Sequence, residues 1–140
     1  VINITFSNGA DLEAKDPDGR TPLMFSVAAG KISFAMCLLQ KGADPCVLDN
    51  DRETLLHVAA DFMQEEMAAI LVERYNFPVN VRSKNHRTPL HLGKHFLLLI
   101  PPLLKTNFNK AASRGDASLC QYFLEHGAEV NAQIKNGRTP

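Results

Sequence analysis

Tryptophan is absent from this sequence of 140 residues, and aromatic residues make up only 7% of it. Cysteine is also scarce: Cys37, Cys46 and Cys120 show no C-x-x-C spacing, so neither a disulfide framework nor a zinc cluster is indicated. Eight glycines and eight prolines are too few for a collagen-like or low-complexity chain. So little cysteine is typical of a reducing compartment, and we expect a cytoplasmic, intracellular location.

Net charge and long apolar runs are missing as well. Fifteen basic residues balance fifteen acidic ones, so no overall field attracts nucleic acid or an anionic membrane. The longest apolar run, residues 96–104, is broken by two prolines and is about half of what a bilayer span needs. We therefore expect a protein partner, bound through local patches, with no nucleic-acid binding and no membrane insertion by this segment.

A short pattern recurs along the chain. Thr21-Pro22-Leu23 returns as Thr54-Leu55-Leu56, as Thr88-Pro89-Leu90 and as Thr139-Pro140, and the threonines are 33, 34 and 51 residues apart. In each copy the threonine hydroxyl can cap a helix, and in every copy except the second a proline at the first helical position lacks an N–H that would have no partner there. A second short helix follows, and turn-forming residues such as Asp49-Asn50-Asp51 then predict a hairpin tip.

This period and these motifs resemble the ankyrin-repeat family. Thr88-Pro89-Leu90-His91-Leu92 and Gly127-Ala128-Glu129-Val130-Asn131 match the family almost letter for letter, whereas Met63 replaces a glycine and Asn76-Phe77-Pro78 a Gly-Ala-Asp. The resemblance implies an all-α solenoid of antiparallel helix pairs with projecting β-hairpin loops. We expect one array over residues 1–140, as part of a longer one, with repeats at 1–18 (partial), 19–51, 52–85 and 86–136 and the start of another at 137–140.

The expected elements follow from this register. Helices are predicted at 22–29, 33–41, 55–62, 64–74, 88 onward and 117–126. Hairpins are predicted at 10–20, 43–53, 77–87 and 128–138, and unusual backbone only within 93–112.

Residues 93–110 interrupt the third repeat inside its first helix. Deleting them joins Leu92 to Ala111 and restores an unbroken repeat, which makes an accidental fit improbable. Two interpretations stay open. Either the protein contains a genuine insertion, which must displace part of the helix because broken backbone hydrogen bonds cost roughly 1–3 kcal/mol each, or the segment is a translated, retained intron.

The sequence shows no pattern for a catalytic, metal-binding or phosphate-binding site. The resemblance implies that His57 and His91 hydrogen-bond to backbone, and no other pattern has the spacing of metal ligands, a nucleophile with its base, or a phosphate loop. We therefore predict no catalytic residue, no metal and no cofactor, and a chain that is not an enzyme.

The resemblance implies instead a protein–protein interaction module, such as a scaffold or an adaptor. Partners of such arrays dock on the hairpin tips and the groove along the first helices. Phe62 is the strongest candidate for a partner contact, because aromatic side chains are frequent in binding hot spots. The alternative is a regulatory or substrate-recruiting arm of a larger enzyme or ion channel. The register places these residues in the groove: Asp18, Arg20, Asn50, Asp51, Glu53, Asp61, Phe62, Lys84, Asn85, Arg87 and Arg114.

Overall fold

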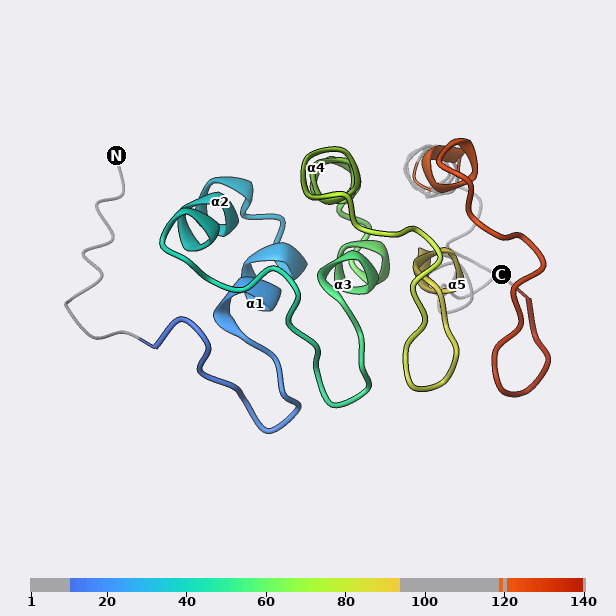
Figure 1. Cartoon of the computed structure of the whole chain (residues 1–140), viewed down its shortest axis with the longest axis horizontal. Coiled ribbons are helices and arrows are strands. Elements are labelled where there is room, and N and C mark those ends of the chain that lie inside the picture. The colour runs from blue at the N-terminus through green and yellow to red at the C-terminus, as the bar shows by residue number, and fades with distance from the viewer. Residues whose placement is uncertain (1–10, 94–118, 120, 140) are drawn as a thin grey trace, which may run out of the picture.

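The computed structural model describes residues 11–93, 119 and 121–139, and within these ranges it contains helices and turns. Helices α1 (Pro22–Ala28) and α2 (Ile32–Gln40) form one pair, and α3 (Leu55–Asp61) and α4 (Glu65–Tyr75) form the next. Helix α5 (Pro89–Gly93) begins a third, beyond which residues 121–125 are helical. Figure 1 shows two rows of helices, with α1, α3 and α5 in one row and the loops projecting beyond it. The expected all-α solenoid of helix pairs is confirmed.

The first helix of each pair begins where its threonine predicts. The Thr21 hydroxyl accepts a hydrogen bond from the Met24 N–H at 3.5 Å. The Thr54 hydroxyl does the same for the His57 N–H, and the His57 Nδ1 accepts from the Thr54 N–H at 3.2 Å. These bonds satisfy donors that would otherwise lack a partner at a helix start. The described helix ends lie within one residue of those predicted from the sequence.

The core lies between the two rows of helices. The first-helix leucines Leu23, Leu56 and Leu90 are 1%, 0% and 6% exposed, so all three point inward as their shared register position predicts. The equivalent second-helix side chains, Leu38, Leu71 and Phe123, are at most 1% exposed. Each repeat thus buries its apolar face against its neighbours, which is how a solenoid is stabilised.

In the described part of the chain, four tip loops project from the array, at residues 16–20, 49–53, 83–87 and 134–138. In each, the first residue's N–H donates to the fifth residue's carbonyl, at 3.0, 3.3, 2.9 and 2.9 Å respectively. Neighbouring tips are also joined by backbone hydrogen bonds: Asn50 to Asp18, Lys84 to Asp51 and Lys135 to Asn85. The described parts of these hairpins consist of tight turns rather than strands, because one such bond per loop is too short a ladder to form a strand.

The expectation that unusual backbone is confined to 93–112 is wrong. Arg52, Met63, Asn76 and His86 all have a positive φ, between 54° and 61°. They stand where other repeats have Gly19, Gly30 or Gly42 in the same left-handed conformation. The turn shape is imposed by packing of the repeats, so it persists where the side chain disfavours it. The predicted interruption at 93–110 falls, from residue 94 on, outside the described residues.

Candidate partner-binding surface

A hollow of about 430 Å³ lies between α1 and α3, and we call it the α1–α3 hollow. Phe25 of α1 and Phe62 at the end of α3 both line it, and their side chains remain 49% and 53% exposed. Ala28 and Ala29 contribute small side chains on the α1 side, which leaves the space between the helices open. Two large exposed rings at one opening present an apolar surface to solvent.

Carboxylates surround this apolar surface. Asp49, Glu53 and Asp61 line the same hollow. Burial raises the pKa of the Glu53 carboxyl, the neighbouring Arg87 opposes that shift, and the nearby acids Asp49 and Asp61 add to it. The Glu53 Oε1 accepts from the Arg87 Nη2 at 2.5 Å, so one carboxylate is already paired across the two tip loops. Asp61 lies exposed beside Phe62.

Among the described residues that line the α1–α3 hollow, Arg20 is the only basic one, and it is already paired. It forms ion pairs with Asp16, at 3.0 Å, and with Asp18. Hydrogen bonding from the Arg20 backbone N–H lowers the pKa of the Asp16 carboxyl. The guanidinium also lies over the Phe25 ring, 5.3 Å from its centroid, which is a cation–π distance. The negative charge of the hollow is therefore only partly balanced.

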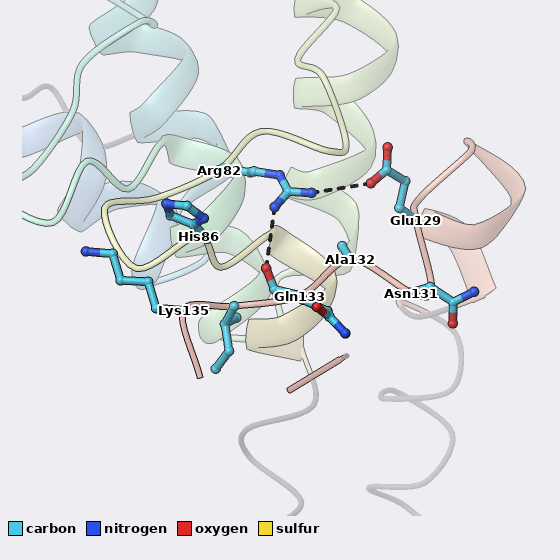
Figure 2. A pocket seen from close by; sticks show the side chains of 8 residues that line it. Arg82, His86, Glu129, Asn131, Ala132, Gln133 and Lys135 are labelled. Atoms are coloured by element: carbon cyan, nitrogen blue, oxygen red, sulfur yellow. Dashed lines mark hydrogen bonds and ion pairs between the residues drawn. The ribbon is translucent and has the colours of Figure 1, made fainter. Parts of the chain in front are cut away.

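A second, more polar hollow of about 610 Å³ lies at the other end of the described array. Figure 2 shows Arg82 placed between Glu129 and the Gln133 backbone, with His86 and Lys135 at the same opening. The Arg82 guanidinium donates to the Gln133 carbonyl at 3.4 Å and lies 3.5 Å from the Glu129 carboxylate. Basic side chains thus dominate this end, whereas carboxylates dominate the α1–α3 hollow.

The structure brings some of the sequence-predicted residues together and separates others. Arg20, Glu53, Asp61 and Phe62 line the α1–α3 hollow. Arg87 joins them only through Glu53, and Arg114 is outside the described residues. The remaining predicted residues are exposed on the first three tip loops: Asp18, Asn50, Asp51, Lys84 and Asn85.

Phe25 was missed by sequence reasoning. The register aligns it with Val58 and Leu92, which are 7% and 3% exposed, so an apolar residue there predicts a buried position. A phenylalanine is larger than valine, and half of its surface stays outside the packed space. The larger size of phenylalanine at this position was the one sequence feature that could have indicated its exposure.

The histidines that follow the Thr-x-Leu pattern, His57 and His91, bond to neighbouring backbone and threonine groups. His57 is fully buried: its Nε2 lies 2.9 Å from the Arg87 carbonyl and its Nδ1 lies 3.0 Å from the Thr54 hydroxyl. The His91 Nδ1 similarly lies 2.8 Å from the Thr88 hydroxyl. Burial lowers the pKa of both imidazoles. Over the described ranges, no three His, Cys, Asp or Glu side chains are grouped to hold a metal ion.

Comparison with known proteins identifies the family. A family model described as ankyrin repeats (3 copies) matches residues 1–85, and one described as ankyrin repeat matches 85–135. The chain belongs to the ankyrin-repeat family, whose repeats are protein-interaction modules without catalytic activity of their own, and it is a protein-interaction module of this kind.

Three relatives illustrate the proteins in which similar arrays occur. The chain is 32% identical to ankyrin repeat domain-containing protein 53 of Homo sapiens, over 84% of this chain and 19% of that protein. It is 27% identical to the putative palmitoyltransferase ZDHHC13 of Danio rerio, over 99% of this chain and 24% of that protein. It is 26% identical to NF-kappa-B inhibitor delta of Mus musculus, over 91% and 40%. The chain thus spans about a fifth of the length of the first of these relatives.

Among the described helices, none combines the length and the apolar character needed to cross a bilayer.

Proposed function

We propose that this module binds a cytoplasmic protein partner through its tip loops and the groove along its first helices. The observation that supports this most directly is the α1–α3 hollow, where Phe25 and Phe62 expose about half of their surface. Exposed aromatic side chains at an opening provide contact area with little loss of side-chain entropy on binding. The tip-loop residues predicted from the sequence would extend this contact along the array.

The proposed role is non-catalytic recognition, as a scaffold or an adaptor. The sequence contains no group of residues spaced for catalysis, and His57 and His91 are engaged with backbone and threonine groups. A second candidate is a regulatory or substrate-recruiting arm of a larger enzyme. It is favoured by the match to a putative palmitoyltransferase, of whose length this chain spans about a quarter.

The experiment uses peptides selected from a random display library on the 140-residue chain, measured by surface plasmon resonance. Phe62→Ala should raise the dissociation rate about 30-fold, equivalent to about 2 kcal/mol at a hot spot, with little change in association rate. Leu124→Ala serves as the matched control, because Leu124 is also exposed (40%) but lies in the second-helix row.

The contrary outcome is specific. If Phe62→Ala binds like the unmodified chain and Gln121→Arg in the second-helix row abolishes binding, the groove is not the working surface.

A further inference from the structure

The α1–α3 hollow combines an apolar opening with an unbalanced negative charge. Asp49, Glu53 and Asp61 line it together with the two exposed phenylalanines. The pairing of Glu53 with Arg87 leaves Asp49 and Asp61 as carboxylates that no cation of the described chain contacts at ion-pair distance. Like charges at one opening repel one another, and a cation entering the hollow would relieve that repulsion.

Arg20 does not supply this cation: its ion pairs are with Asp16 and Asp18, and it attracts Asp49 only from beyond ion-pair distance. Arg20 is held by Asp16 and Asp18 in the first tip loop, where the Asp16 carboxylate also accepts the Arg20 backbone N–H at 2.8 Å. It shows, however, that a guanidinium already lies over one ring of this surface, at 5.3 Å from the Phe25 centroid. The ring of Phe62 lies at the other side of the hollow, beside Asp61.

We infer that the hollow receives one arginine side chain of the partner protein, with its stem against Phe25 and Phe62 and its guanidinium facing Asp61 and Asp49. This inference rests on the proposed function. The volume of about 430 Å³ accommodates one long side chain rather than a helix or a domain edge. The stem of an arginine is apolar and its head is charged, so this residue matches both properties of the hollow. Guanidinium groups also stack on aromatic faces and are less strongly hydrated than ammonium groups.

The test starts from peptides that need the hollow. A random-peptide display library is selected on the 140-residue chain and counter-selected on the Phe25→Ala/Phe62→Ala double variant. We expect the surviving peptides to be enriched in arginine next to an apolar residue. In the tightest peptide, replacing that arginine by norleucine keeps an apolar stem and removes the charge, and should weaken binding about fivefold or more.

A double-mutant cycle then tests whether the arginine of the peptide interacts with Asp61. Against Asp61→Asn, the difference between the arginine and norleucine peptides should shrink at least twofold, because one of the two carboxylates that face the guanidinium is gone while Asp49 remains. Glu66→Gln is the matched control: Glu66 is an exposed acid at the start of α4, in the other helix row, and its variant should keep the full difference.

The outcomes separate the two proposals. Hollow-dependent peptides that lack arginine, or a norleucine peptide that binds the unmodified chain equally well, would overturn this inference and leave the proposed function intact. If no peptide survives the counter-selection, and the peptides selected before it lose binding on Gln121→Arg in the second-helix row, both proposals are overturned.

Discussion

Four of the described non-glycine residues occupy a backbone conformation that glycine ordinarily takes. Arg52 and His86 take it in tip loops, Met63 and Asn76 at the ends of first and second helices. A left-handed conformation costs a non-glycine residue roughly 1–2 kcal/mol. The cost is tolerated because the surrounding turn is fixed by the packing of neighbouring repeats.

Replacing Arg52 by glycine should therefore stabilise the chain. Arg52 is exposed and its N–H donates to the Asp49 carbonyl at 3.0 Å, a bond that glycine retains. We expect the free energy of unfolding to rise by roughly 0.5–1 kcal/mol, since relief of strain exceeds the entropy that glycine loses on folding. Urea unfolding measures the change as a shifted midpoint at constant slope.

The register partner of Arg52 supplies the opposite control. At Gly19, with φ +80°, an added Cβ would lie 2.5 Å from the Asn50 Oδ1 and 2.9 Å from the Asn50 backbone nitrogen. Gly19→Ala should destabilise the chain by more than Arg52→Gly stabilises it. Equal stability of Arg52→Gly and Arg52→Ala would contradict the assignment of strain to this position.

The buried His57 makes stability depend on pH near neutrality. Burial lowers its pKa below the ordinary 6.5, so the unfolded chain binds more protons than the folded one between these two values. The stabilisation by neutral His57 is thus present above about pH 6.5 and is lost as the pH falls through the folded pKa. Unfolding free energies from pH 5 to 8 should decline toward acid less steeply in His57→Gln than in the unmodified chain.

Two other groups contribute to the same profile and are separated by comparison. The lowered pKa of His91 acts with the same sign, so part of the slope should persist in His57→Gln. The raised pKa of Glu53 acts with the opposite sign, because its contribution is lost as the pH rises. The contributions of His91 and Glu53 cancel when the unfolding free energy of His57→Gln is subtracted from that of the unmodified chain. If this difference in free energy does not vary with pH, the role of His57 is refuted.

At the scale of the helices, each element is short and depends on its neighbours. Helix α1 has 7 residues and α3 also has 7, which is below the length at which an isolated helix is stable in water. Their stability comes from apolar faces packed against the adjoining pair. Helix α3 contacts both α1 and α5, so it transmits stability to both sides.

The loss of protection caused by truncating a core leucine should extend to different repeats, depending on where the leucine lies. Leu56→Ala and Leu23→Ala should each lower the free energy of unfolding by roughly 2–5 kcal/mol. In hydrogen exchange, Leu56→Ala should reduce protection in α1 and α5, whereas Leu23→Ala should leave residues 121–138 protected, because repeats couple only to neighbours. Leu124→Ala, at a side chain that is 40% exposed, should change stability by less than about 0.5 kcal/mol.

A uniform loss of protection with either leucine variant would mean that the array unfolds as one cooperative unit.

The helix starts were predictable from sequence because a cap is a local device. Thr21 and Thr54 accept hydrogen bonds from N–H groups only three residues away, so the local sequence alone determines the geometry of the helix cap. The left-handed turns were not predictable at Met63 or Arg52, since nothing local requires them there. They follow from a loop shape that the whole array imposes, and only the register with glycine-containing repeats indicates it.

Across the whole molecule, charge is sorted along the tip loops. The first two tips carry Asp16, Asp18, Asp49 and Asp51, whereas the later ones carry Lys84, His86 and Lys135. A partner that follows the array would place basic groups over the first tips and acidic groups over the later ones. Exposed charges of this kind act at long range and guide encounter more than they hold the complex.

Charge reversal at the tips should accordingly change association more than dissociation. Asp51→Lys and Lys84→Glu should each slow association with a groove-binding peptide that carries both charges, and the effect should shrink at 0.5 M salt. Surface plasmon resonance at two salt concentrations measures both rates. An effect that persists in high salt, or that lies in the dissociation rate, would argue for a direct buried contact instead.

The candidate site was only partly predictable from sequence, because its residues come from different repeats. The register placed Glu53 and Arg87 in the groove but did not show that they pair with each other at 2.5 Å, which depends on how two loops stack. Phe25 was hidden by an alignment with buried residues. The repeat boundaries, the groove residues and everything assigned to 93–110 beyond Gly93 stay predictions.

The backbone hydrogen bonds between neighbouring tips make one edge of the array resist stretching. Each tip is joined to the next by a directional bond, Asn50 to Asp18 at 3.0 Å and Lys84 to Asp51 at 2.7 Å, whereas the helix rows are held by apolar packing that permits sliding. When the array bends, we therefore expect the spacing of tips to stay constant and the row of second helices to spread or close. We expect a force along the array to change its curvature before it changes the distance between tips.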